Sequence, residues 1–342
     1  MGSAAIARLN GALARFSRAG LCTLPTPLEP MTRLSRHLAG PRLWVKREDC
    51  SGPGFGGNKL RKLDYVLHEA LRGGADTLVS GGVVQSNSQR QVAAAAAKLG
   101  LDCHLAVYHG RLAPPSPEYG RTGNALLNRL FGATLHDVPW NGDRNGAIHD
   151  LAARLQSQGR KTYVVPYGVS NPLGAAGYAS TVAEIAQQCS ALDVQPRAIV
   201  HCSGSAGTQA GLVVGARVCL PDTRIVGIDI DAEPERVRGD VLALGRAAAE
   251  LLDQPFDEAD VEVVAGHAGP AYGVPHEATV EAIRLAARLE ALVLDPVYSG
   301  KGLAGLIALI RAGRWSRDDD IVFLHTGGAP ALFAYRHLFD PE

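Results

Sequence analysis

Residues 56–63 read Gly-Gly-Asn-Lys-Leu-Arg-Lys-Leu, a glycine-rich turn that passes into an apolar-periodic helix predicted over residues 58–72. The lysine at the start of this helix is Lys59. A lysine amine becomes a good nucleophile only when burial or neighbouring cations lower its pKa, and a helix start beside Arg61 and Lys62 can provide both. Lys59 is therefore a candidate for covalent chemistry, although a solvated basic turn on a surface helix would have the same sequence.

Strand and helix patterns alternate outward from this stretch. The helix stops at Gly73-Gly74 and is followed by a strand at 76–79, a Gly-Gly-Val-Val-Gln-Ser-Asn turn at 81–87 and an alanine-rich helix that ends at Gly100. Further strand and helix pairs are predicted at 103–107 with 121–131, 134–138 with 146–158, and 162–165 with 173–189, and further strands at 198–202, 224–229 and 321–324. This alternation is typical of an α/β protein whose parallel sheets are covered by helices on both faces.

The chain of 342 residues is long enough for about two domains. Glycine and proline cluster near residues 52–56 and 166–172. We therefore predict a larger domain formed by residues 1–53 and 168–342, with a smaller α/β domain of residues 54–167 inserted into it. A ligand cleft is expected between the two domains.

Composition limits the class of partner. Lys plus Arg and Asp plus Glu are equal at 34 each, so no overall charge would attract nucleic acid or an anionic membrane, and a small molecule is the expected partner. The six cysteines form no Cys-x-x-Cys pair and no metal-ligand spacing with histidine, which predicts reduced cysteines in a cytoplasmic protein and no metal site. No apolar run reaches the roughly 20 residues of a membrane span. The first 20 residues contain three arginines and no acid, a pattern that faintly resembles a transit peptide but favours a short amphipathic helix.

A second chemical segment, Ser-Gly-Ser-Ala-Gly-Thr at 203–208, follows an apolar strand and opens a helix. Unpaired amides and the positive end of a helix face an anion in such a turn, so the segment predicts a site for one small phosphate. A dinucleotide-binding turn would need further glycines, although Asp229 stands where a ribose ligand would be, and the hydrolase motif around Ser205 lacks its first glycine.

Three more polar segments lie where strands or helices end. Gln-Ser-Asn at 85–87 could grip a carboxylate, although Ser86 could equally be a plain helix cap. Near the end of the chain, Asp-Pro-Val-Tyr-Ser-Gly-Lys at 295–301 and His-Thr-Gly-Gly at 325–328 occupy predicted loops. Within the first of these, Tyr298 could also be a core tyrosine and Lys301 a surface charge.

In this order, the segments resemble the pyridoxal-phosphate enzymes of the D-cysteine desulfhydrase and 1-aminocyclopropane-1-carboxylate deaminase family over almost the whole chain. The resemblance is carried by residues 56–63, 85–87, 204–211, 272–275, 295–301 and 325–335. It implies the tryptophan-synthase-β-like fold, called fold type II, with pyridoxal 5'-phosphate as cofactor and a small amino acid as substrate. The family's habit also suggests a homodimer.

The resemblance implies catalytic roles for four residues. Lys59 would bind the cofactor as a Schiff base and, once displaced by the substrate amine, would take the α-proton. Ser86 would bind the substrate carboxylate or handle a proton, while Tyr272 and Tyr298 would line the substrate side.

Implied cofactor contacts come from five parts of the chain. Asn87 would bond the phenolic oxygen, and Lys62 would assist a loop that holds the phosphate. The residues of that loop are Gly204, Ser205, Ala206, Gly207 and Thr208. Ser299 and Thr326 would face the pyridine nitrogen.

The residues at the ring nitrogen favour β-elimination. Cyclopropane deaminases have Glu where this chain has Ser299 and Leu where it has Thr326. A hydroxyl partner leaves a weaker electron sink than a carboxylate, which suits expulsion of a good leaving group better than opening of a ring. The expected products from a cysteine-like amino acid are pyruvate, ammonia and sulfide.

Several alternatives stay open at this point. With the same cofactor, the chain could be a 1-aminocyclopropane-1-carboxylate deaminase, a cysteate sulfo-lyase or an amino-acid racemase. Outside this class, it could be an NAD-dependent dehydrogenase that uses Asp229 or a non-catalytic amino-acid binder. Departures from the desulfhydrase pattern at Ser88, 121–124 and 167–170 predict a reshaped substrate pocket.

Overall fold

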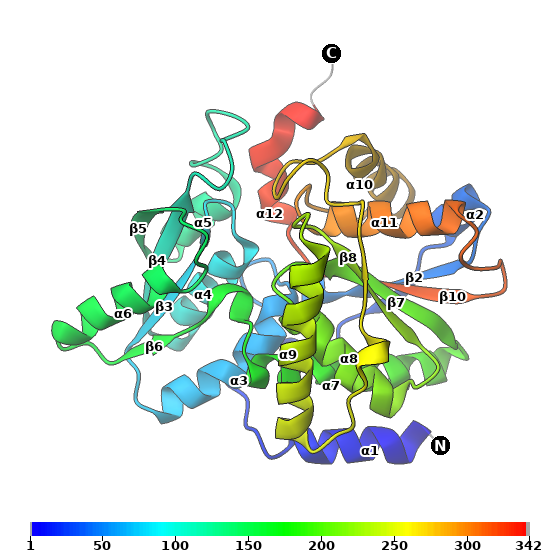
Figure 1. The fold of residues 1–342 in the computed structure, drawn as a ribbon, viewed down its shortest axis with the longest axis horizontal. Coiled ribbons are helices and arrows are strands. Elements are labelled where there is room, and N and C mark those ends of the chain that lie inside the picture. The colour runs from blue at the N-terminus through cyan, green and yellow to red at the C-terminus, as the bar shows by residue number, and fades with distance from the viewer. Residues whose placement is uncertain (1, 340–342) are drawn as a thin grey trace.

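The computed structural model describes residues 2–339 and contains two β-sheets that lie side by side along the longest axis of the molecule (Figure 1). The larger sheet has the strand order β1-β2-β10-β7-β8-β9. Its strands are β1 (Leu28–Pro30), β2 (Arg42–Arg47), β7 (Pro196–Ser203), β8 (Arg224–Asp229), β9 (Glu262–Val264) and β10 (Asp320–His325). All neighbours pair in parallel except β1 and β2, which are antiparallel.

The smaller sheet has the order β5-β4-β3-β6 and is parallel throughout. Its strands are β3 (Thr77–Val83), β4 (Asp102–His109), β5 (Thr134–Pro139) and β6 (Thr162–Val164). Helix α6 (Gly146–Ser157) covers one face, where Ile148 and Leu151 pack with Val79 of β3. The helices α3 (Asn58–Arg72) and α4 (Asn87–Leu99) contribute to the buried cluster that also contains Leu78 and Leu105 of this sheet.

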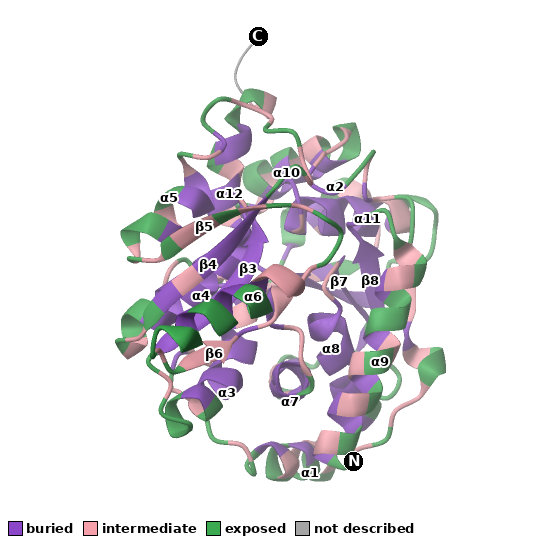
Figure 2. Cartoon of the chain, turned by 60° about the vertical axis from the view of Figure 1, so that its left-hand side comes forward, coloured by how far each residue is buried: buried purple, intermediate pink, exposed green. Residues whose placement is uncertain are grey.

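Side chains of the larger sheet alternate between two helical layers, as expected for strands buried on both faces. Val200 and Phe323 belong to a cluster with α2 (Thr32–Leu38), α10 (Glu277–Glu290) and α11 (Ser299–Arg311). Ile199 and Val322, the adjacent residues, belong to a cluster with α7 (Pro172–Leu192), α8 (Gly207–Cys219) and α9 (Pro234–Leu252). In Figure 2 the strands β3, β4, β7 and β8 are accordingly buried, whereas α6 and α9 carry exposed residues.

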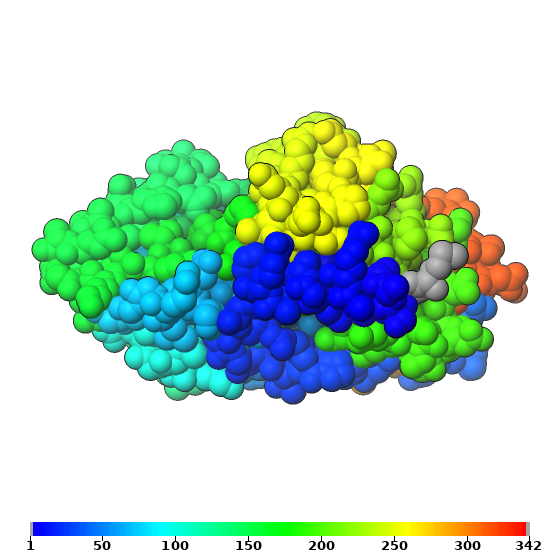
Figure 3. Space-filling model, turned by 90° about the horizontal axis from the view of Figure 1, so that it is seen from below, coloured from blue at the N-terminus to red at the C-terminus, as the bar shows by residue number. Residues whose placement is uncertain are grey.

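A single core connects the two sheets. Helix α3 packs on both α4 and α7, and α7 packs on α8, so one apolar cluster runs from the smaller sheet to the larger one. Helix α1 (Gly2–Leu13) lies across the outside of this layer, as Figure 3 shows, and inserts Leu9 and Leu13 into the cluster. The predicted amphipathic N-terminal helix is therefore confirmed.

Most predicted elements are confirmed, including the helix at 58–72 and the helix that ends before Gly100. The pattern analysis missed β1, β2 and β9, three strands at or near the edges of the larger sheet. Of the cysteines, Cys50 is exposed, Cys22 is partly buried and the other four are buried, and all six are free. None of the helices in residues 2–339 is long and apolar enough to cross a membrane.

Candidate active site

Three segments that are far apart in the sequence meet at the carboxyl ends of β7 and β10. The backbone N–H of Asn58, the first residue of α3, donates to the carbonyl oxygen of Thr326 at 3.0 Å. The Asn58 side chain donates to the hydroxyl of Thr208, in the first turn of α8, at 2.8 Å. Parallel α/β sheets place ligands at such carboxyl ends, beside the N-termini of the following helices.

A pocket with about 290 Å³ of empty space opens at this junction. Its lining residues come from the start of α3, the end of β7, the loop into α8 and the segment before α11: Asn58, Lys59, Cys202, Ser203, Gly204, Ser205, Ala206, Thr208, Gln209 and Tyr298. Lys59, Tyr298 and most of the predicted phosphate loop thus line one cavity. Lys62, Tyr272 and Thr326 each contact a residue of this loop or lining.

The amine of Lys59 has the environment that a nucleophile needs. Burial lowers its pKa, and the charge of Arg90 acts in the same direction, whereas Cys202 and Asp295 oppose the change. No described residue accepts a hydrogen bond from the Lys59 amine, which lies 5.5 Å from the centre of the Tyr298 ring. The alternative of a solvated surface turn is therefore wrong. An amine with a lowered pKa and no hydrogen-bond partner is suited to attack a carbonyl carbon.

The loop before α8 has a strained backbone conformation at Ala206. Ala206 has φ 67° and ψ −40°, and the N–H of Gly207 donates to the carbonyl of Ser205 at 2.8 Å. Together these define a γ-turn with positive φ, a rare and strained conformation that persists where function requires it. A Cβ at Gly204 would lie 2.8 Å from the end of the Ile230 side chain, so a larger residue there would require that side chain to shift.

Lys62 brings a second amine to the same loop. It is fully buried, and its amine donates to the carbonyl of Gly168 at 2.8 Å. A Cβ on Gly207 would lie only 3.0 Å from the Lys62 amine, so this amine stands at the positive end of α8. Burial, and next the proximity of Lys59, lower the pKa of Lys62 well below its usual value. An anion bound at this helix N-terminus would favour the protonated form of Lys62, so the site fits a phosphate group.

Ser86 and Asn87 begin α4 on the side of the smaller sheet. Ser86 is the N-cap, since its hydroxyl accepts from the Gln89 N–H at 3.2 Å. It makes no hydrogen bond to a described residue that lines the pocket. The amide oxygen of Asn87 accepts from Asn124 at 2.7 Å, which leaves the Asn87 N–H groups to donate. Asn124 therefore fixes the orientation of the Asn87 side chain.

Ser299 and Thr326 both lie buried near Asp295, but each hydroxyl has its own partner. Ser299 donates to the Asp295 carboxylate at 2.8 Å, and the Thr326 hydroxyl lies 3.2 Å from the Cys202 sulfur. Asp295 also accepts from the backbone N–H groups of residues 297–299. Behind the predicted ring-nitrogen hydroxyl there is thus a buried carboxylate.

Tyr272 and Tyr298 form a hydroxyl pair beside Lys59. Their oxygens are 2.5 Å apart and their rings meet edge to face, with centroids 6.0 Å apart. Lys301, for which a surface position was one alternative, is instead buried and donates to the carbonyls of Ala268 and Ala271, just before Tyr272. Arg111 belongs to none of the predicted motifs, yet its guanidinium lies 4.0 Å from the centre of the Tyr272 ring.

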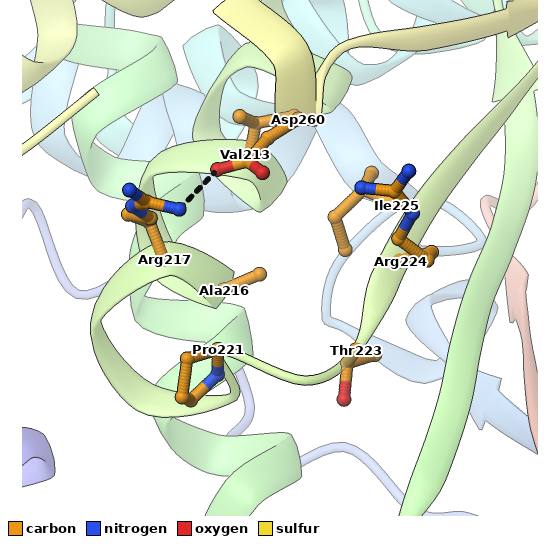
Figure 4. Close-up of a pocket in the computed structure, with 8 residues that line it drawn as sticks. All are labelled: Val213, Ala216, Arg217, Pro221, Thr223, Arg224, Ile225 and Asp260. Atoms are coloured by element: carbon orange, nitrogen blue, oxygen red, sulfur yellow. Dashed lines mark hydrogen bonds and ion pairs between the residues drawn. The ribbon is translucent and has the colours of Figure 1, made fainter. Parts of the chain in front are cut away.

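Another pocket, with about 300 Å³ of empty space, lies at the C-terminal end of α8 (Figure 4). Its walls include Val213 and Ile225, and an ion pair of 3.5 Å joins Arg217 to Asp260. Its lining contains no lysine, histidine or cysteine, and it lies toward the C-terminal end of α8, whereas the loop at residues 203–208 leads into the N-terminal end of that helix. Of these two pockets, only the Lys59 pocket contains a candidate nucleophile.

Comparisons with known proteins agree with this geometry. The family described as pyridoxal-phosphate dependent enzyme matches residues 21–327. D-cysteine desulfhydrases of Salmonella newport (strain SL254) and Salmonella choleraesuis (strain SC-B67) are each 44% identical to the chain over 323 residues, 94% of this chain and 97% of theirs.

The chain also resembles solved structures. An ACC deaminase homologue superimposes with a TM-score of 0.86 at 33% identity, over 97% of this chain and 98% of its own. The processed form of threonine deaminase isoform 2 from Solanum lycopersicum has a TM-score of 0.67 at 16% identity, over 99% of this chain and 88% of its own, and shares the fold alone.

Proposed function

Because the chain belongs to the family of pyridoxal-phosphate dependent enzymes, we propose that it catalyses the α,β-elimination of D-cysteine to pyruvate, ammonia and sulfide. The observation that carries this proposal is the half-buried Lys59, whose amine has no hydrogen-bond partner among the described residues. Its pocket also contains an anion cradle, formed by the loop at residues 204–208 with Lys62 beside it. The identity to D-cysteine desulfhydrases over nearly the whole chain supports the choice of substrate.

The coarser predictions are confirmed by the family. The chain is a lyase of fold type II, and its cofactor is pyridoxal 5'-phosphate. The dehydrogenase alternative receives no support, and Asp229 accepts instead from the backbone N–H groups of Asp231 and Glu233.

The residues around the pocket have distinct proposed tasks. When bound, the cofactor supplies an electron sink for the α-carbon of the amino acid. Lys59 would hold the cofactor and then accept the α-proton. Asn87 would donate to the phenolic oxygen, the amides of residues 204–208 with Lys62 would hold the phosphate, and Ser299 and Thr326 would lie at the ring nitrogen. Ser86, Tyr272 and Tyr298 would orient the substrate and move protons at its carboxylate and leaving group.

We also propose a cytoplasmic homodimer with the inserted domain at residues 54–167. The free, mostly buried cysteines support a reducing compartment. Leu126 and Leu130 lie one turn apart on α5 (Gly123–Leu130), which packs against α12 (Ala329–Leu332), and Phe333 follows α12. Their exposed fractions are 52%, 72% and 63%, and an apolar group of this kind supports contact with a second copy.

The test of the proposed function is an absorption spectrum of the purified protein before and after addition of D-cysteine, with sulfide and pyruvate assayed in the same sample. We expect a visible cofactor band that responds to D-cysteine, and both products in equal amounts. A band that changes without product would reject D-cysteine as the substrate. No visible band after reconstitution with pyridoxal phosphate would reject the assignment of the site.

A second candidate is 1-aminocyclopropane-1-carboxylate, because the chain superimposes closely on an ACC deaminase homologue. The double variant Ser299→Glu with Thr326→Leu installs the residues of the cyclopropane deaminases. A carboxylate at the ring nitrogen would strengthen the electron sink, so we expect the ratio of kcat/KM for the cyclopropane over D-cysteine to rise about tenfold. The two single variants are the controls. An unchanged ratio in the double variant would refute the ring-nitrogen argument.

A further inference from the structure

Arg111 joins the smaller sheet to the tyrosine pair. It follows β4, in the loop before α5, and its guanidinium lies 4.0 Å from the centre of the Tyr272 ring and 4.9 Å from that of Trp140. The same group donates to the Tyr167 hydroxyl at 3.1 Å and lies 3.4 Å from the carboxylate of Asp231, just beyond β8. The aromatic rings and the hydrogen-bond acceptors together fix the Arg111 guanidinium in one position.

Asp231 is itself held in place by arginines. Arg144, from the loop between β5 and α6, reaches it at 2.8 Å, and Arg236 of α9 reaches it at 2.5 Å. Arg236 also pairs with Glu233 and Asp240, and Arg144 also lies 3.9 Å from Glu233, whereas the ion pair of Arg111 among the described residues is with Asp231 alone. Asp231 lies closer to Arg144 and Arg236 than to Arg111, so the Arg111 guanidinium is the most weakly paired of the three and can act on Tyr272.

The tyrosine pair connects Arg111 to the Lys59 pocket. With 2.5 Å between the hydroxyl oxygens of Tyr272 and Tyr298, one hydroxyl must donate and the other accept. The Tyr298 ring in turn faces the amine of Lys59. A phenol that gives its proton to a leaving sulfur becomes a phenolate, which later regains a proton from water. A cation on Tyr272 stabilises that phenolate while the second phenol donates to it.

We propose that Arg111 is a positioning residue for the elimination: it holds Tyr272 against Tyr298 and stabilises the anionic form of this pair while a proton passes to the leaving group. This inference rests on the proposed function, since it requires the tyrosines to serve the reaction. Arg111 contacts neither Lys59 nor the anion cradle, so it acts through Tyr272.

The surrounding charges agree with this role. Burial raises the pKa of both tyrosines. For Tyr272, charges on Tyr298 and Tyr167 would raise the pKa further. The charge of Arg111 lowers the pKa of each tyrosine. Asp231 acts on Tyr298 in the direction opposite to Arg111. The titratable and charged groups that face the pair are Lys59, Arg111, Tyr167, Asp231, Lys301 and Tyr335.

The test is a titration of the tyrosines in the holoenzyme. Fluorinated tyrosine is incorporated throughout, which brings ionisation into an accessible pH range, and the fluorine resonances of Tyr272 and Tyr298 are assigned with Tyr272→Phe and Tyr298→Phe. We expect Arg111→Gln to raise the titration midpoint of the pair by about one pH unit. Asp231→Asn should lower the midpoint, and Arg111→Lys should stay near the parent value. The pH profile of kcat/KM for elimination should shift in the same directions.

Arg314→Gln is the matched control, because Arg314 also stacks on an aromatic ring, that of Trp315, and pairs with a carboxylate, that of Glu262, away from the site. It should leave the midpoint unchanged. Equal midpoints in all variants, or shifts of the same sign in Arg111→Gln and Asp231→Asn, would overturn the proposal. If Arg111→Gln does not fold, the Asp231→Asn and Arg111→Lys titrations decide in the same way. The resonances report on Arg111 whether or not D-cysteine is the substrate, so failure of the proposed function would be recognised separately.

Discussion

Replacing Lys59 with alanine is expected to abolish turnover of D-cysteine, with a loss of about a thousandfold or more. The parent amine is poised by burial, which lowers its pKa, and no described residue accepts a hydrogen bond from it. Alanine removes both the attachment point of the cofactor and the proposed acceptor of the α-proton. The anion cradle, with its γ-turn at Ala206 and the buried Lys62, is left intact.

The measurement pairs activity with chemical mapping. Reduction of the holoenzyme with borohydride should fix the cofactor on the peptide that contains Lys59, where mass spectrometry detects it, and Lys59→Ala should carry no such label. Lys98→Ala, at an exposed position near the end of α4, should keep label and activity. A label on Lys62, or retained turnover in Lys59→Ala, would contradict the assignment.

The segments that could be predicted are those whose chemistry is local. Lys59, the loop at 203–208 and the helix at 58–72 are each encoded by neighbouring residues, since glycines permit the turn and the 3.6-residue period marks the helix. Strand β2 could not be found in this way. Its sequence, Arg-Leu-Trp-Val-Lys-Arg, looks like an exposed segment, yet Lys46 is fully buried because Glu184 and Gln188 of the distant helix α7 accept from its amine.

The parts of the site that could not be predicted depend on contacts between the two sheets. Arg111 and Asp231 are 120 residues apart, and neither belongs to a motif with a recognisable spacing. Their role emerges only when the loop after β4 is folded against the end of β8. The orientation of Asn87 by Asn124 is a similar case, because the two residues begin different helices.

A buried ion network below the site should make Glu48→Ala strongly destabilising. Arg61, two residues after Lys59, is only 2% exposed and donates to both carboxylate oxygens of Glu48, at 2.6 and 2.8 Å. Arg61 also donates to Glu184. Burial opposes ionisation of the Glu184 carboxyl, but the hydrogen bonds and charges of Arg61 and Lys46 lower the pKa of Glu184 to about 2. Removing Glu48 leaves part of a buried guanidinium without partners. We expect a loss of about 3 kcal/mol in the free energy of unfolding, measured by denaturant titration of the apoprotein.

The control for this prediction distinguishes the loss of the ion-pair partner of Arg61 from the loss of side-chain packing at position 48. In the double variant Glu48→Met with Arg61→Met, no uncompensated charge stays buried, so it should be less destabilised than Glu48→Ala. If both variants lose the same free energy, packing rather than charge would explain the effect. The network also ties the first turn of α3 to β2 and α7, so Glu48→Ala should loosen the position of Lys59 and weaken cofactor binding as well as stability. A variant with normal cofactor affinity and a loss of about 3 kcal/mol would show that the network stabilises the fold without positioning the amine.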